Sequence, residues 1–240
     1  MGVVYIMIDE SERKNIGFLI IHGFGGSIEE IQPLNKFLLN NGFSTVCPTL
    51  KGHTGKRKDL KGISYNEWIN SAEQGLMKLR ERSEKIILIG FSMGGLIAVN
   101  LALKHKVCGI ITLSMPIYHW DTKRIFLNIM DDFKKGKFDS LKFYAGASLA
   151  LPLSAMLNFK FLLYKTKPLL TQIKCPILIT QGLRDDAVKH CSAKYIFNNV
   201  SSKKKRLSYY DNSTHVICKS EDQKQLFNDI KIFIDTLHLS

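Results

Sequence analysis

Ser92 lies at the centre of a Gly-x-Ser-x-Gly pattern, between Gly90 and Gly94. Four apolar residues, Ile86–Ile89, precede the pattern, and a helix-forming apolar run, Leu96–Leu103, follows it. Strand, sharp turn and helix is the context in which such a serine is exposed above a sheet as a nucleophile. A Cβ at either glycine would collide with the crossing strand or helix. A serine in an ordinary glycine-rich loop is the alternative, and the two flanking elements favour the nucleophile.

A serine hydroxyl is a weak nucleophile at neutral pH, so Ser92 needs a base, and the base needs an orienting acid. In a doubly wound sheet these partners should follow later strands, in the order serine, aspartate, histidine. Asp185 follows the apolar run Ile177–Thr180, and His215 follows a strand-like segment that ends at Tyr210. We therefore expect Ser92, Asp185 and His215 to form a catalytic triad.

Each expected partner has competitors. For the acid they are Asp186, adjacent along the chain, and Asp211, which precedes the expected base in the same loop. For the base they are His190, predicted at the exposed start of a helix, and His53, predicted in a loop at the mouth of the site. A histidine in a loop is most often structural or solvated, and only its position after a late strand favours His215.

Acyl transfer passes through a tetrahedral oxyanion, which requires preorganised N–H donors. One donor is expected from Met93, directly after the serine, and the second from Phe24 in the loop after an early buried strand. Gly23 and Gly25 flank Phe24 and let the backbone approach the substrate. A phosphate-binding loop is disfavoured, because the Lys-Ser/Thr of a P-loop and the third glycine of G-x-G-x-x-G are both missing.

Elements that could position these residues alternate along the chain, which predicts an α/β fold with a mainly parallel sheet and helices on both faces. Ser27 and Glu30 have the spacing of a capping box at the start of the first helix. The predicted strands are Val3–Ile8, Ile16–Ile21, Phe43–Val46, Ile86–Ile89, Val107–Leu113, Ile177–Thr180 and Arg206–Tyr210. The predicted helices are Ile28–Asn40, Ser64–Arg82, the segment from the serine turn to His105, Ser192–Asn198 and Gln223–Leu237.

The alternation stops between about residues 117 and 167, where two or three short helices are predicted. An insertion between two sheet strands is expected to form a lid or cap over the carboxyl edge of the sheet, where ligands bind. Additional core helices are the alternative. We expect its apolar later part to supply an acyl pocket, with Leu153, Met156 and Leu157 among the substrate-binding residues. Residues 1–240 are predicted to form a single domain with this helical cap inserted.

Composition limits the classes of function. The chain has 240 residues, of which 45% are hydrophobic and 23% are charged, and no apolar run approaches the length of a membrane span. We therefore expect a cytoplasmic protein with no stable membrane anchor. Five scattered cysteines without a C-x-x-C pair predict reduced thiols, partly buried, and no zinc site.

The formal net charge is +13, and the densest basic cluster is Lys203–Arg206. This cluster directly precedes an apolar strand, so we interpret it as a solvated turn and not as a nucleic-acid surface. Transient contact with a lipid surface would follow if the cap exposes an apolar face. The sequence does not indicate an oligomeric state.

Four motifs, HGFGG, GFSMGG, QGLRDDAV and STHV, occur in this order between about Ile16 and the C-terminus. Together they resemble those of serine hydrolases of the α/β-hydrolase superfamily. PTLKGH and SYNEWI, with a small cap and a final helix, are similar to the bacterial carboxylesterase and monoacylglycerol lipase group. The resemblance implies an α/β-hydrolase fold, the same triad and oxyanion amides, and hydrolysis of short- to medium-chain carboxylic esters without a cofactor. The cap matches this group least well, and the two residues beside Ser92 do not fix the substrate.

The leading hypothesis is thus a serine carboxylesterase whose partner is a small-molecule ester, acting on short- to medium-chain acyl esters or monoacylglycerols. A peptidase, lactonase or acyltransferase with the same triad is an alternative, because fold and triad do not choose the acyl acceptor. A non-catalytic receptor is disfavoured, since every catalytic element is present in the sequence.

Overall fold

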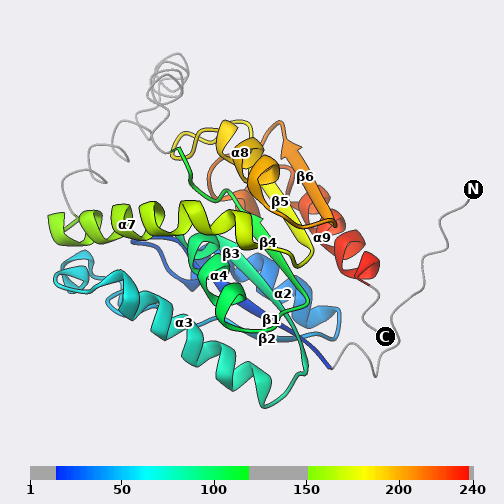
Figure 1. The fold of residues 1–240 in the computed structure, drawn as a ribbon, viewed down its shortest axis with the longest axis horizontal. Coiled ribbons are helices and arrows are strands. Elements are labelled where there is room, and N and C mark those ends of the chain that lie inside the picture. The colour runs from blue at the N-terminus through cyan, green and yellow to red at the C-terminus, as the bar shows by residue number, and fades with distance from the viewer. Residues whose placement is uncertain (1–14, 119–150, 238–240) are drawn as a thin grey trace, which may run out of the picture.

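The computed structural model describes residues 15–118 and 151–237, and its centre is a six-stranded sheet (Figure 1). The order of strands is β2-β1-β3-β4-β5-β6, and every neighbouring pair is parallel. The predicted parallel α/β sheet is therefore confirmed, while the predicted strand Val3–Ile8 lies outside the described residues. The strands are β1 (Ile16–Ile21), β2 (Ser44–Val46), β3 (Lys85–Phe91), β4 (Gly109–Leu113), β5 (Ile177–Gly182) and β6 (Lys205–Tyr210).

Helices cover both faces of the sheet (Figure 1). One face packs against α2 and α9, and the other packs against α3, α4, α7 and α8. The helices are α2 (Gln32–Asn40), α3 (Tyr65–Arg80), α4 (Met93–Lys104), α7 (Leu153–Thr166), α8 (Cys191–Asn199) and α9 (Gln223–Thr236). Short 3₁₀ helices, η1 to η4, span Ile28–Glu30, Arg57–Leu60, Lys167–Gln172 and Ile217–Lys219.

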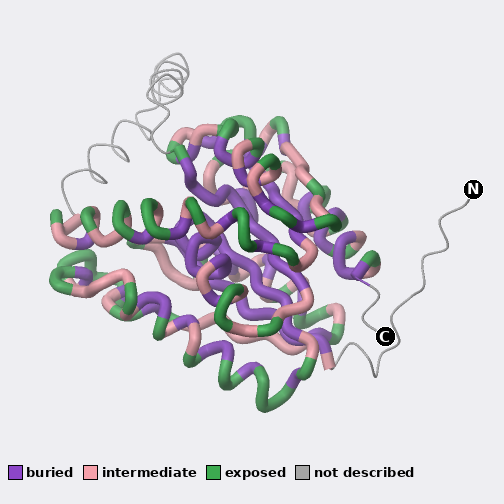
Figure 2. Tube along the Cα trace, in the orientation of Figure 1, coloured by how far each residue is buried: buried purple, intermediate pink, exposed green. Residues whose placement is uncertain are grey.

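Strand β1 shows why the apolar runs of this sequence form strands buried on both faces. Phe18 and Ile20 point into the layer of α2 and α9, whereas Leu19 and Ile21 point into the layer of α3 and α4. Successive side chains alternate between faces, so a strand covered on both sides has no polar positions. Figure 2 shows the resulting buried centre, with exposure confined mainly to the outer turns of the helices and the loops.

The helix predicted over Ile28–Asn40 is divided, and only half of its predicted capping box forms. The Glu30 carboxylate accepts the backbone N–H of Ser27 and also that of Gly23, but the Ser27 hydroxyl accepts the N–H of Glu29 and not that of Glu30. A 3₁₀ turn ends there, and α2 starts afresh with Pro33 in its first turn, where a missing N–H costs nothing.

The later part of the insertion, α7, packs as a core helix. Ala155 and Leu162 are fully buried in the layer of α3 and α4. Asn100 of α4 donates to the hydroxyl of Thr166 over 2.7 Å, and the Tyr65 amide of α3 donates to Asn158 over 3.1 Å. These contacts match the alternative of additional core helices for this part, and residues 119–150 of the predicted cap lie outside the described residues.

All five cysteines are free thiols, as the sequence predicted. Cys47, Cys108 and Cys175 are half-buried, Cys218 is buried and Cys191 is exposed. Burial raises the pKa of Cys47 to about 12 and that of Cys175 to about 11, so both stay protonated at neutral pH. In the part of the chain that the structure describes, no helix is long and apolar enough to cross a membrane.

Candidate active site

Ser92 lies in the sharp turn between β3 and α4. Its backbone has φ 51° and ψ −120°, a strained conformation for a residue with a side chain. A Cβ on Gly90 would lie 2.3 Å from the carbonyl oxygen of Gly94, and one on Gly94 would lie 2.2 Å from that of Ile21. Only glycines permit so close an approach of strand and helix at this turn.

Three side chains that are distant in the sequence form one hydrogen-bonded chain here. The hydroxyl oxygen of Ser92 lies 3.1 Å from Nε2 of His215, and Nδ1 of His215 lies 2.9 Å from Oδ2 of Asp185. Ser92 is 8% exposed, the His215 side chain 22%, and the Asp185 side chain is fully buried. The residues follow the carboxyl ends of β3, β5 and β6, as a parallel sheet requires.

Asp185 is held by four hydrogen bonds, of which the sequence predicted only the one with His215. Its Oδ1 accepts the N–H groups of Ala187 at 2.9 Å and Val188 at 2.8 Å. Its Oδ2 accepts both His215 and the side-chain amide of Gln181, the latter at 2.8 Å. Gln181 lies near the carboxyl end of the fully buried strand β5, and a glutamine in a buried strand was the available signal.

The residues that the sequence left as alternatives for the acid and the base are not members of this chain of hydrogen bonds. Asp186 is half-buried beside the aspartate that bonds His215, and Asp211 is exposed. His190 is exposed directly before α8, where the sequence predicted it. His53 is buried beneath the loop after β1 and bonds the backbone there.

Electrostatics around His215 favour its protonated form. Burial acts to lower the pKa of His215, but the adjacent Asp185 carboxylate, by charge and by hydrogen bond, outweighs it. The charges of Asp186 and Glu30 add to this effect, so the net shift of the His215 pKa is upward. Phe91 packs against the imidazole at 5.0 Å between ring centroids and limits its rotation. The ring can therefore take a proton from Ser92 and hold it as an imidazolium.

The loop after β1 contains Phe24, whose N–H the sequence predicted as an oxyanion donor, and the preceding Gly23. The carbonyl of Gly23 accepts a hydrogen bond at 2.9 Å from Nδ1 of His22. Because Nε2 of His22 accepts the N–H of Leu50, the ring proton must be on Nδ1. The N–H of Gly26 also donates to the Gly23 carbonyl. The peptide that carries the Phe24 N–H is thus fixed from its carbonyl side.

His53 ties the same loop to the segment after β2. Its Nε2 accepts the N–H of Gly25 at 3.1 Å, and its Nδ1 donates to the carbonyl of Lys51. The Phe24 ring stacks on Phe159 of α7 with centroids 5.2 Å apart and an interplanar angle of 11°. Trp68 of α3 packs on Phe24 from another direction, at 5.6 Å. Aromatic rings therefore form the apolar side of this loop.

The fold agrees with the comparison to known protein families. A family described as alpha/beta hydrolase fold matches residues 18–143 of the 240. The chain belongs to the alpha/beta hydrolase fold family. This region contains the nucleophile turn and the loop after β1.

Two curated relatives are similar to this α/β hydrolase over nearly their whole length. The thermostable monoacylglycerol lipase of Bacillus sp. (strain H-257) is 28% identical over 227 residues, which cover 90% of this chain and 89% of the relative. The carboxylesterase of Bacillus subtilis (strain 168) is 23% identical over 226 residues, which cover 91% of this chain and 92% of the relative.

Solved structures show the same fold. A structure from the work on LipS and LipT, two metagenome-derived lipolytic enzymes, superposes with a TM-score of 0.78 at 21% identity and covers 93% of this chain and 94% of its own. A soluble variant of the monoglyceride lipase of Saccharomyces cerevisiae gives a TM-score of 0.68 at 19% identity and covers 93% of this chain and 87% of its own. At these identities the likeness concerns the fold alone.

The residues predicted for the acyl pocket of this hydrolase occupy different environments. Leu153 and Leu157 lie on the exposed side of α7, at 71% and 45% exposure, and Met156 is half-buried. The residues that meet the loop after β1 are instead Phe159 and Leu151, the latter 3.3 Å from where a Cβ on Gly25 would lie. Sequence reasoning missed Phe159 because a helical pattern does not show which face meets a distant loop.

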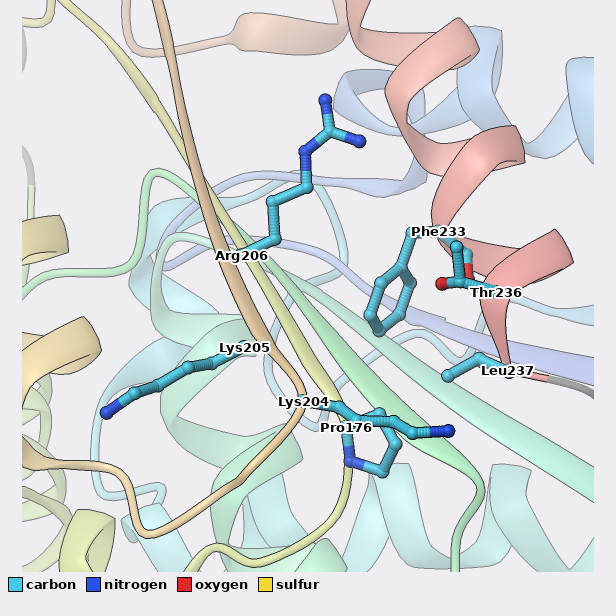
Figure 3. Close-up of a pocket in the computed structure, with 7 residues that line it drawn as sticks. All are labelled: Pro176, Lys204, Lys205, Arg206, Phe233, Thr236 and Leu237. Atoms are coloured by element: carbon cyan, nitrogen blue, oxygen red, sulfur yellow. The ribbon is translucent and has the colours of Figure 1, made fainter. Parts of the chain in front are cut away.

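A surface cavity lies at the opposite edge of the sheet, near the amino ends of β5 and β6 (Figure 3). Two of its three basic side chains are already engaged: Arg206 bonds Asp229 at 2.6 Å, and Lys205 points away from Phe233 and donates to two backbone carbonyls. The predicted turn leading into a strand is confirmed here. The lining residues are Pro176, Lys204, Lys205, Arg206, Phe233, Thr236 and Leu237. The residues after the carboxyl ends of the strands thus remain the candidate site.

Within the described ranges, no group of three or more His, Cys, Asp and Glu side chains is arranged to hold a metal ion. The chemistry that this site can perform with its own residues is nucleophilic attack by a serine with proton transfer through a histidine.

Proposed function

We propose that this α/β hydrolase is a serine carboxylesterase that cleaves carboxylic esters through an acyl-Ser92 intermediate. The observation that carries the proposal is the chain of hydrogen bonds from Ser92 through His215 to Asp185, with distances of 3.1 and 2.9 Å. A nucleophile bonded to a base, and a base bonded to an orienting acid, is the arrangement that acyl transfer needs.

In the first half-reaction, Nε2 of His215 takes the hydroxyl proton while Oγ of Ser92 bonds to the carbonyl carbon of the ester. The tetrahedral intermediate then breaks its bond to the alcohol oxygen, and the alcohol leaves with the proton from His215. Asp185 keeps Nδ1 of the ring protonated and stabilises the imidazolium. In the second half-reaction, a water molecule loses a proton to His215 as its oxygen bonds to the acyl carbon; the bond from that carbon to Oγ of Ser92 then breaks, His215 returns the proton to Oγ, and the carboxylic acid is released.

The negative oxygen of both intermediates requires two N–H donors. Met93 is the first residue of α4, so its N–H is among the helix-terminal groups without an intrahelical acceptor. Phe24 supplies the second N–H, and its peptide is oriented by the hydrogen bond from His22 to Gly23. Both donors are backbone groups, one at the buried start of α4 and the other in a half-buried loop whose carbonyl is held by hydrogen bonds.

We propose short- to medium-chain acyl esters or monoacylglycerols as substrates. Support comes from the apolar surface that Phe24, Leu151 and Phe159 form at the loop after β1, and from the names of the two curated relatives. Gly23 and Gly25 allow the substrate to approach the backbone, and Met156 extends the apolar surface. Leu153 and Leu157 are assigned to its outer rim, in accord with their exposure.

The test is hydrolysis of p-nitrophenyl esters from acetate to palmitate, with a Ser92→Ala variant measured alongside. We expect activity with a maximum at short to medium chains, and no activity in the variant despite an unchanged unfolding transition. Ester hydrolysis that survives the Ser92→Ala change would refute the proposal. Inactivity toward all esters, with Ser92 still labelled by a fluorophosphonate, would redirect the search to amides, lactones or acyl transfer.

A further inference from the structure

Glu30 places a carboxylate against the loop that bears the Phe24 amide. Its Oε2 accepts the N–H of Gly23 at 3.4 Å. A Cβ on Gly26 would lie 2.1 Å from the same oxygen, so the carboxylate lies directly on the backbone of that residue. Residues from both ends of the loop therefore depend on one side chain, which is itself half-buried.

The same carboxylate faces the segment that contains the base. Burial raises the pKa of the Glu30 carboxyl, and the ionised carboxylate interacts favourably with His215 and with Lys219, the last residue of η4. Cys218 of the same segment is buried, and Glu30 adds to the burial that keeps its thiol protonated. Glu30 therefore lies between the loop of the expected oxyanion donor and the loop of the base, and it belongs to neither.

On the basis of the proposed function, we propose that Glu30 is a positioning residue for the reaction. Its hydrogen bond fixes the His22–Gly23 peptide, which directly precedes the peptide that carries the Phe24 N–H. Its negative charge stabilises the imidazolium of His215. The two effects act at the same stage, because the oxyanion and the imidazolium form together as Ser92 attacks the ester.

Hydrogen bond and charge can be separated by substitution. Glu30→Gln keeps an oxygen that accepts the Gly23 N–H but removes the charge, whereas Glu30→Ala removes both. Glu29→Gln is the matched control, because Glu29 is an exposed carboxylate in the same 3₁₀ turn and its loss changes the net charge equally.

For Glu30→Ala we expect kcat to fall by roughly 10- to 100-fold with little change in KM, since misplacement of a donor affects the transition state most. For Glu30→Gln we expect a smaller loss of kcat and a shift of the acid limb of the kcat/KM profile to lower pH. The direction follows because one of the three carboxylates that raise the His215 pKa is gone, while Asp185 and Asp186 remain. Glu29→Gln should leave both quantities unchanged.

Equal kcat and an equal acid limb in all three variants would overturn the inference. The inference would also be overturned if kcat/KM of Glu30→Ala fell only through a rise in KM, because that would indicate a role in substrate binding. Circular dichroism and thermal unfolding of Glu30→Gln establish that the comparison concerns folded protein. If the wild type hydrolyses no ester, the proposed function fails separately. The rate of Ser92 labelling by a fluorophosphonate then tests Glu30 with the same variants, because labelling uses the same base and donors.

Discussion

Nδ1 of His22 lies 2.9 Å from the carbonyl oxygen of Gly23, and this contact orients the peptide that carries the Phe24 N–H. The peptide unit is planar and trans, so its N–H points away from a carbonyl that is held in place. The other ring nitrogen accepts the N–H of Leu50, which links the loop after β1 to the segment after β2. A single buried imidazole thus links two segments on which the site depends.

Replacing His22 with leucine should lower both stability and activity. The change leaves the Gly23 carbonyl and the Leu50 N–H without their buried partner, and we expect the free energy of unfolding to fall by about 2–4 kcal/mol. We also expect kcat for a short-chain ester to fall, because the Gly23–Phe24 peptide keeps only the hydrogen bond from the Gly26 N–H to its carbonyl. Urea denaturation and steady-state kinetics measure the two effects. His190→Leu, at an exposed histidine, is the control and should change neither.

Stability should decrease as the pH falls below neutral. Burial lowers the pKa of His22 from its ordinary value of 6.5 to about 4, and burial also lowers that of His53. Between pH 6.5 and about 4, His22 is protonated in the unfolded chain but not in the folded chain. The free energy of unfolding therefore has its full value above about pH 6.5 and decreases as the pH falls toward 4. The His22 contribution is on the order of 3 kcal/mol.

Urea unfolding at about pH 7 and about pH 5 tests this dependence in the wild type and in His22→Leu. The variant should lose less stability over this interval, because it lacks the group that titrates. His215 has a raised pKa and acts in the opposite direction, since its contribution is present at low pH and is lost as the pH rises. Identical slopes in the two proteins would contradict the assignment to His22.

Substitutions of Gln181 should separate a lost hydrogen bond from an added charge. Gln181→Leu removes one donor from Asp185, and we expect a loss of about 1–2 kcal/mol in the free energy of unfolding. Gln181→Glu puts a second carboxylate against the same oxygen, and we expect a larger loss, about 2–4 kcal/mol, that diminishes at low pH as one carboxyl is protonated. If urea unfolding showed the same decrease in the free energy of unfolding for both variants at every pH, the contact of Gln181 with Asp185 would be unimportant for stability.

Shortening Phe159 should affect long acyl chains more than short ones. Phe159→Ala removes the ring that stacks on Phe24, and we expect KM for a medium-chain ester to rise about tenfold, with acetate nearly unaffected. Phe161→Ala is the control, because Phe161 lies on the same helix but is 54% exposed. Equal effects of the two changes, in an ester series of increasing length, would exclude a specific role for Phe159.

Local signals predicted the central elements because each depends on neighbours in the chain. The apolar run before Ser92 and the helix-forming run after it require a strand and a helix, and the two glycines are explained by backbone contacts within that one turn. Asp185 and His215 could be predicted because parallel strands present all their carboxyl ends at one edge. Their order along the chain then suffices to bring them together.

Glu30 shows the limit of local reasoning. Its spacing from Ser27 satisfies the capping-box pattern, and its carboxylate accepts the Ser27 N–H, but it also accepts the Gly23 N–H and faces His215. Two N–H donors were available to the same side chain, and sequence spacing describes only the local one. The same limit applies to Phe159, whose contact with Phe24 joins a helix of the insertion to a loop far earlier in the chain.

The sequence by itself determined the order of strands and helices, the strained nucleophile turn and the identity of the three residues in the hydrogen-bonded chain. These features follow from backbone sterics and from the periodicity of apolar residues, which act over a few positions. Only the tertiary structure decided which polar groups support them: Gln181 on Asp185, His22 on the Gly23 carbonyl and Glu30 on the Gly23 amide. A buried polar group must find a partner, but the partner is set by how distant segments pack, and the local sequence pattern does not contain that information.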